Sequence, residues 1–238
     1  MSIEQYLYDK CLPGAKEAEQ DRKHRNRNSS LLLLMCFHVP CLYAHHDTSM
    51  RTDLNFSYTF NEHFQAVTYV FIQADQHISN YDYGEWGIGL QYQTPLSWLS
   101  FLIYYQQGYS KDDDRHWELE QKPSINMNTQ VKFSGFKISN QIRFEYRIRP
   151  EWNDCRIKNT LVISRPDLIF QLQPYIGWEM FYENHDKALM LNRIKLGISR
   201  NIGSHVSVGP YYRIDLSNIN SGWEWTRQLI GFHVTINY

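Results

Sequence analysis

The 238-residue chain lacks the features of several common protein classes. No apolar run approaches the roughly 20 residues of a membrane-spanning helix; the longest, residues 31–43, is interrupted by His38 and Pro40. The 24 Lys and Arg are balanced by 25 Asp and Glu, so the basic stripe of a nucleic-acid-binding protein is missing. The ten histidines show no metal-ligand spacing. We therefore expect no nucleic-acid partner, no metal and no cofactor.

Cysteine is also scarce, and most of it lies near the N-terminus. Three of the four cysteines, Cys11, Cys36 and Cys41, precede residue 45, which leaves Cys155 without an internal disulfide partner. In the same region a basic stretch, residues 22–27, is followed by the short apolar run and then by Ala44. This order is typical of a secretory signal peptide. We predict an N-terminal extension and signal peptide over residues 1–44; the alternative is a loose tail on a cytosolic protein.

From about residue 51 the sequence alternates between apolar and polar side chains, and residues 45–238 form the predicted barrel domain. A period of two residues is the pattern of a β-strand with one apolar and one polar face. The cleanest example is the run from Lys137 to Arg149, where Ile142, Phe144 and Tyr146 alternate with charged residues. Eleven such segments can be counted. They predict an all-β fold, an up-and-down antiparallel transmembrane β-barrel of about 10–12 strands.

The last strand ends at the carboxyl terminus itself. Its apolar face ends in an aromatic residue, which resembles the C-terminal signal that the assembly machinery of bacterial outer-membrane barrels reads. The residues assigned to this signal are Phe232, Val234, Ile236 and Tyr238.

Two further expectations concern the closure of the barrel. Single-chain bacterial barrels close with an even number of strands, so either a strand lies hidden before Met50 or one segment lies outside the wall. Short turns, such as Asn61-Glu62 and Ser134-Gly135, alternate with longer polar segments, such as Ser79–Tyr83 and Ser217–Glu224. This pattern predicts short periplasmic turns and longer outward-facing loops.

Alternation alone leaves open which face points inward. The apolar rows carry many bulky aromatic residues, among the 17 Tyr, 7 Trp and 12 Phe of the chain. A small barrel has an interior that side chains just fill, and these rows are too large for it. We therefore expect them to face lipid; the alternative is a soluble barrel or sandwich that encloses them.

The polar rows carry charge unevenly. Asp53, Asp75, Glu85, Glu118 and Glu120 lie in the N-terminal half, and the C-terminal half is rich in arginine and lysine, which predicts one acidic and one basic wall. The two walls either pair and plug the lumen or form a narrow channel that prefers anions. We also expect Asp215 to lie opposite Arg227. The predicted lumen charge cluster is Arg143, Glu145, Arg147, Arg149, Arg156, Lys158, Glu179, Arg193, Lys195, Arg213, Asp215 and Arg227.

One string has the pattern of an enzyme. His77-Ile78-Ser79-Asn80 is similar to the His-x-Ser-Asn pattern of outer-membrane lipid hydrolases, in which histidine activates a serine nucleophile. The small residue that usually follows is Tyr81 here, and strand parity turns His77 away from the lipid. The favoured interpretation is a polar strand end, so no catalytic residue and no enzyme is predicted. A lipid hydrolase using Ser79 and His77 is kept as an alternative.

Several stretches together resemble a known family. They are Lys137–Pro150, then Gln173-Pro174-Tyr175-Ile176, and Val208–Arg213 with the aromatic-terminated last strand. They are similar to bacterial outer-membrane β-barrels of the domain of unknown function 2490 (DUF2490) type. The resemblance covers about residues 50–238; it implies location and architecture and supplies no activity.

These observations lead to one functional expectation. The protein is a barrel of the outer membrane of a Gram-negative bacterium, structural or a narrow porin-like pore with a charged lumen. Its partners are the lipid bilayer, the barrel-assembly machinery and a small anionic solute. An anion-preferring channel for acidic solutes or oligosaccharides is the alternative.

Overall fold

A computed structural model describes residues 47–75, 80–111, 116–166, 171–184, 188–219 and 222–238. By contacts the chain divides into two units, residues 1–45 and 46–238. The first, which contains the predicted signal peptide, lies outside the described residues. Within the described residues, no helix is long and apolar enough to cross a membrane.

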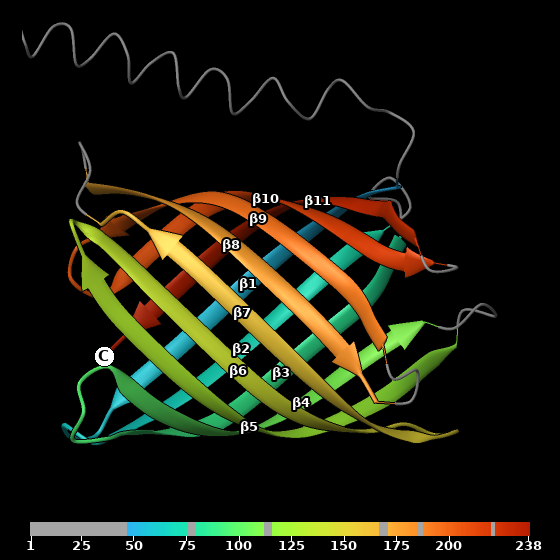
Figure 1. Ribbon diagram of the computed structural model, residues 1–238, viewed down its shortest axis with the longest axis horizontal. Coiled ribbons are helices and arrows are strands. Elements are labelled where there is room, and N and C mark those ends of the chain that lie inside the picture. The colour runs from blue at the N-terminus through green and yellow to red at the C-terminus, as the bar shows by residue number, and fades with distance from the viewer. Residues whose placement is uncertain (1–46, 76–79, 112–115, 167–170, 185–187, 220–221) are drawn as a thin grey trace, which may run out of the picture. The chain divides into compact units, whose positions relative to one another are not determined.

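The second unit is a closed barrel of eleven strands, each paired with its neighbours along the chain (Figure 1). The strands are β1 (Asp47–Thr59), β2 (Phe64–Asp75), β3 (Asn80–Gln93), β4 (Leu99–Lys111), β5 (Trp117–Phe133), β6 (Phe136–Ile148), β7 (Asn153–Ser164), β8 (Leu172–Glu183), β9 (Ala188–Ile202), β10 (Val206–Ile219) and β11 (Gly222–Asn237). The predicted all-β barrel is confirmed, and the number of strands falls within the expected 10–12.

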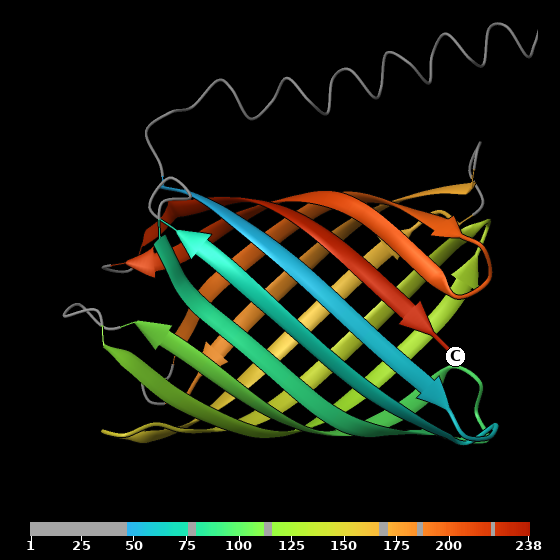
Figure 2. The same ribbon diagram turned by 180° about the vertical axis from the view of Figure 1, so that it is seen from behind.

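The barrel closes through a parallel pair, which the sequence did not lead us to expect. β1 pairs with β11 from Asp47 opposite Arg227 to Ser57 opposite Asn237, and both strands run in the same direction (Figure 2). All other neighbouring strands are antiparallel. All eleven segments counted in the sequence therefore belong to the wall. The expectation of an even number of strands is wrong, because a parallel seam satisfies the backbone hydrogen-bonding groups of both edge strands in a barrel with an odd number of strands.

The connecting loops at the two ends of the barrel differ less in length than expected. We call these ends the C-terminal end, where Tyr238 lies, and the Asp47 end, where β1 begins. Residues predicted to form long loops at the Asp47 end belong to strands instead: Asn80–Tyr83 to β3 and Ser217–Ile219 to β10. The connection between β10 and β11 is reduced to residues 220–221. The prediction of longer loops at this end is wrong, because polar strand ends have the same composition as loops.

The apolar rows face outward and the charged rows face inward. Phe144 is 54% exposed on the outer surface, and Trp178 and Phe232 on other strands are also exposed, whereas Arg147 is only 6% exposed inside the barrel. The buried polar residues outnumber the buried apolar ones. This arrangement is the reverse of a water-soluble barrel, which encloses its apolar side chains, and it confirms the predicted direction of the two faces.

Two asparagines interrupt the outward apolar rows. Asn140 on β6 and Asn159 on β7 exchange amide hydrogen bonds of 3.2 and 3.3 Å. Each amide therefore satisfies part of the other's hydrogen-bonding capacity, which lowers the cost of placing it on an apolar surface.

Inward-facing tyrosines fit against glycines of the neighbouring strand. The ring of Tyr104 on β4 occupies the space where a side chain on Gly89 of β3 would begin, and Tyr211 on β10 lies in the same way against Gly231 of β11. A Cβ on Gly89 would lie 2.1 Å from the Tyr104 ring and 2.6 Å from the backbone oxygen of Ile103. Glycine at this position lets the ring lie close to the wall.

Gly89→Ala should therefore destabilise the barrel by about 1–3 kcal/mol, because the backbone oxygen of Ile103 cannot move aside. The free energy of unfolding in urea, measured on protein refolded in detergent micelles, tests this. Gly177→Ala is the matched control, since its Cβ meets only ordinary contacts of 3.6–3.9 Å. Equal stability of the two variants would contradict the close fit.

Candidate functional site: a charged lumen

The lumen of the barrel holds the twelve residues predicted as a charge cluster. Eleven of them lie on the inward rows of β6 to β11, and Arg149 follows the last residue of β6 at the Asp47 end. They form several connected groups of ion pairs, and residues absent from the prediction join them.

Two buried glutamates are the centres of the largest group. Glu120 on β5 accepts hydrogen bonds from Nε of Arg147 at 2.6 Å and from Nε of Arg149 at 2.8 Å. Glu145 on β6 accepts one from Nε of Arg156 at 2.7 Å and a longer one, 3.3 Å, from Arg143. Charge-assisted hydrogen bonds of this length are among the stronger ones in proteins. They hold the arginine side chains in fixed positions.

A second group links β2, β3 and β5. The carboxylate of Glu85 accepts hydrogen bonds from the hydroxyls of Tyr69 and Tyr83 and from Nζ of Lys122. Lys122 also lies 3.3 Å from Glu120. Lys122 is almost fully buried, and its charge is balanced by these two carboxylates.

A third group lies on β9 to β11. Arg213 donates two hydrogen bonds to Asp215, at 2.7 and 3.0 Å. Asp215 is the Cα partner of Arg227, as expected. The ion pair of Arg227, however, is with Asp75 on β2, at 3.4 Å. The bulge between Asp215 and Leu216 accompanies this change of partner.

Lys195 on β9 contacts aromatic rings rather than a carboxylate. Its Nζ lies 3.6 Å from the centroid of the Tyr211 ring and 5.9 Å from that of Tyr175. The Tyr211 hydroxyl in turn donates a 2.5 Å hydrogen bond to Asp53, which also accepts one from Arg51.

The predicted division into an acidic and a basic wall is incomplete. Arg51 and Lys122 lie among the acidic residues of the N-terminal half, and Glu183 lies among the basic residues, bonded to Arg147 at 2.6 Å. Sequence reasoning missed these residues. Lys122 precedes Pro123, which breaks the alternating pattern, and Glu183 was assigned to a loop. Strand parity would have placed Arg51 in the lumen, because it lies two residues before the inward-facing Asp53.

Sequence reasoning also missed the aromatic residues inside the barrel. Phe71, Tyr104, Phe181 and Tyr211 are buried in the lumen. Tyr104 stacks on Tyr69 with 5.5 Å between ring centroids. The only available signal was strand parity, because each of these residues lies between two outward-facing apolar neighbours. Phe181 and Tyr211 also lie two residues from an inward-facing charge.

Two cavities of the lumen are lined by described residues. One of about 670 Å³ lies toward the Asp47 end and is lined by the Glu120, Glu145 and Glu85 groups. Its described lining residues include ten basic and seven acidic side chains, an excess of three positive charges. The other, of about 410 Å³, lies toward the C-terminal end and is lined mainly by amide and hydroxyl side chains, with Leu102 and Trp98. Buried Tyr104 and Asn126 lie between the lining residues of the two cavities on β4 and β5.

Phe232 and Tyr238 are exposed on the outer surface, with Val234 and Ile236 half-buried in the same row. Tyr238 is tied to the seam, because its N–H donates to the Ser57 oxygen at 3.0 Å. His77 and Ser79 lie outside the described residues. Within the described residues, no group of three or more His, Cys, Asp or Glu could hold a metal ion.

Glu120→Gln should lower the free energy of unfolding by about 3 kcal/mol, because Arg147 and Arg149 would lose a charged acceptor inside the barrel. The midpoint of urea unfolding in detergent micelles measures the change. Glu224→Gln, an exposed glutamate on β11, is the control and should leave the midpoint unchanged. A small effect of Glu120→Gln would mean that water, rather than Glu120, balances the two arginines.

Comparison with known proteins gives a family but no activity. No curated protein sequence matches the chain. Among solved structures, LpxR from Salmonella typhimurium is similar with a TM-score of 0.43 and 8% identity, over 76% of this chain and 84% of that one. This similarity is too low to carry a conclusion. The model of the family described as "Protein of unknown function (DUF2490)" matches residues 49–226, and the chain, as its residues suggested, belongs to that family.

Proposed function

We propose that the protein is a β-barrel of the bacterial outer membrane whose lumen is closed at mid-height. We propose that its carboxyl terminus faces the periplasm, so that the charged cavity at the Asp47 end opens to the outside. The observation that carries the proposal is the combination of an apolar outer surface with a filled, ionic interior.

The outer surface supports a location in a bilayer. In the described part of the chain, large apolar side chains are exposed on ten of the eleven strands, all but β10, among them Leu54, Ile88, Ile125 and Leu196. Each forgoes about 1.5–3 kcal/mol if it faces water rather than an apolar phase. Monomeric soluble proteins rarely expose contiguous patches of this kind. The strands have 12–17 residues, more than the roughly 9–11 that cross a bilayer with tilt.

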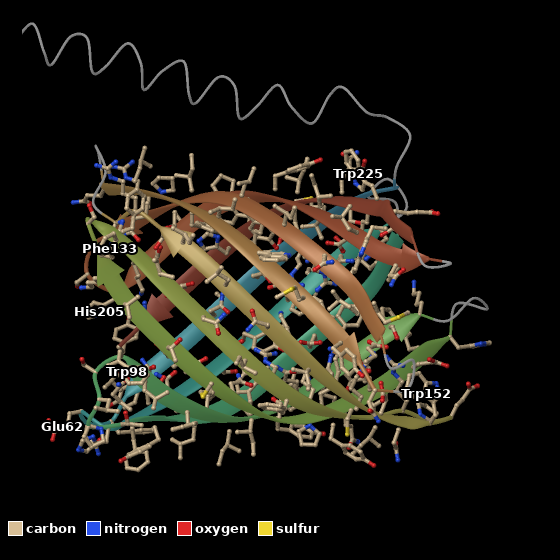
Figure 3. All side chains as sticks on the ribbon, viewed as in Figure 1. Glu62, Trp98, Phe133, Trp152, His205 and Trp225 are labelled. Atoms are coloured by element: carbon tan, nitrogen blue, oxygen red, sulfur yellow. The ribbon has the colours of Figure 1, made fainter. Side chains whose placement is uncertain are left out.

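Aromatic residues near both ends of the barrel support the same location. Tyr58 and Phe133 are exposed near the C-terminal end, and Tyr81 and Trp117 near the Asp47 end. Phe133 lies at one end of the barrel in Figure 3 and Trp225 toward the other. Two aromatic girdles mark the water–lipid interfaces of outer-membrane barrels.

The filled interior supports a closed lumen. Gln106, Asn126 and Leu229 face inward from β4, β5 and β11 and are fully or almost fully buried. Tyr104 lies between the lining residues of the two cavities on β4, and its ring stacks on that of Tyr69, which lines the larger cavity. Ion pairs also join strands that are not direct neighbours, as Arg227 on β11 with Asp75 on β2, past β1. Of the two alternatives for the charged lumen, these contacts therefore favour a plugged interior over an open channel.

The excess of basic residues in the larger cavity favours a second candidate function. An anion-preferring channel for acidic solutes or oligosaccharides would use this cavity as its entrance. Passage would then require Tyr69 and Tyr104 to move apart.

The location can be tested with one substitution on the outer surface. Phe144→Arg should lower the stability of the barrel in lipid vesicles by about 2–4 kcal/mol, because it places a charge against the hydrocarbon. Wild-type protein should be found in the outer-membrane fraction of cells that express it. Glu224→Arg, at the end of a strand, is the control and should have little effect. Full stability of Phe144→Arg would argue against a bilayer around β6.

The closure can be tested by recording from planar lipid bilayers. Wild-type protein should give no steady ion conductance, and the double variant Tyr69→Ala/Tyr104→Ala should conduct, because the two stacked rings inside the barrel are removed. Tyr105→Ala, which removes a ring on the outer face of the same strand, should remain silent. Steady conductance of the wild-type protein with preference for anions would support the channel instead.

A further inference from the structure

Cationic side chains converge at the inner limit of the 670 Å³ cavity. The ring of Phe181 on β8 is buried there, and Arg156, Lys158 and Arg193 lie 5.3, 5.0 and 4.7 Å from its centroid. Arg143 is the Cα partner of Lys158 on the adjoining strand. Arg143 and Lys158 are the cavity-lining residues of β6 and β7 that lie farthest from the Asp47 end. The inner limit of the cavity thus carries concentrated positive charge.

The neighbouring carboxylates balance this charge only in part. Glu145 is bonded most closely to Arg156, at 2.7 Å. Lys158 and Arg193 share the single carboxylate of Glu179, at 3.2 and 3.7 Å. Arg193 also lies 3.4 Å from Asp215, whose two oxygens already accept hydrogen bonds from Arg213.

Arg193 has unused hydrogen-bonding capacity. A guanidinium group carries five N–H donors. Its contacts with carboxylates are long: an Nη lies 3.7 Å from Glu179 and Nε lies 3.4 Å from Asp215. Among the described residues, none accepts a hydrogen bond from this buried Nε. The planar donors of arginine match the geometry of phosphate and carboxylate groups. An oxyanion in this position would use the free donors and balance the surplus charge.

We propose that Arg143, Lys158 and Arg193 form a binding site for an oxyanion, a phosphate or carboxylate group, at the inner limit of the cavity. Phe181 provides the apolar surface beside it. The cavity is larger than the anion alone, so the group is carried by a small acidic solute or by the head group of an anionic lipid. The inference rests on the proposed function only in that the cavity opens toward the outside of the cell.

Isothermal titration calorimetry with inorganic phosphate tests the site directly. The full chain is folded in uncharged detergent micelles, and ionic strength is held constant with sodium chloride. We expect one saturable site per chain. Arg193→Gln should weaken phosphate binding roughly tenfold, since it removes a charge-assisted contact. Arg193→Lys keeps the charge without the planar donors and should bind with intermediate affinity.

Arg200→Gln is the matched control, because Arg200 is an exposed arginine on the same strand; its phosphate affinity should equal that of the wild-type protein. Heat-dependent mobility in electrophoresis shows that each variant is folded. Absence of saturable binding by the wild-type protein overturns the proposal. So does wild-type affinity in the folded Arg193→Gln or Arg193→Lys variant.

The source of the oxyanion is resolved by a second measurement. Phosphate binding is compared in nanodiscs of phosphatidylcholine with and without phosphatidic acid. Weaker apparent phosphate affinity in the presence of phosphatidic acid supports a lipid head group, and equal affinity supports a free solute. Because binding is measured without ion flow, a failure of this site is distinguishable from a failure of the closed-lumen proposal.

Discussion

The parallel pairing of β1 with β11 is the constraint on which the rest of the barrel depends. A strand edge leaves a row of N–H and C=O groups without partners, and within a bilayer no water can satisfy them. The seam from Asp47 to Ser57 satisfies both edges of an eleven-stranded wall. The side chains of β1 and β11 then continue the inward and outward rows without interruption, so Asp53 faces His233 across the seam.

The closed wall determines where charge can be placed. With the outer surface apolar, most ionisable side chains of the strands point into a narrow interior, where an unpaired charge is costly. Glu120 and Glu145 meet this requirement by binding two arginines each. The pairs hold the side chains in fixed positions, so the incomplete pairing of Arg193 is a fixed feature of the lumen. Many cations of the lumen have a carboxylate within 3 Å, whereas the carboxylates near Arg193 lie 3.4 and 3.7 Å away and Lys195 contacts aromatic rings instead.

Local alternation predicted much of this architecture. The run from Lys137 to Arg149 identified its own inward and outward rows, because every second residue changes face in a strand. The same logic located all eleven strands. It failed at strand ends, because polar residues such as those of Asn80–Tyr83 occur equally in loops. It also failed to predict the parallel closing pair, because the direction of that pair depends on the total number of strands rather than on any local pattern.

The pairing of charges was harder to predict than their direction. Which carboxylate an arginine reaches depends on register and on bulges, as Arg227 shows by bonding to Asp75 rather than to its Cα partner Asp215. The aromatic residues inside the lumen depend on glycines one strand away, as Tyr104 depends on Gly89. Such contacts join residues from different strands, and no single-strand periodicity contains them.

The odd number of strands has a consequence for biogenesis. Tyr238 and Asp47 lie at opposite ends of the barrel. In the proposed orientation, with the carboxyl terminus in the periplasm, the first residue of β1 emerges on the cell surface. A barrel with an even number of strands keeps both of its chain ends on the periplasmic side. In this orientation, the amino end of β1 would have to cross the bilayer before the seam with β11 closes.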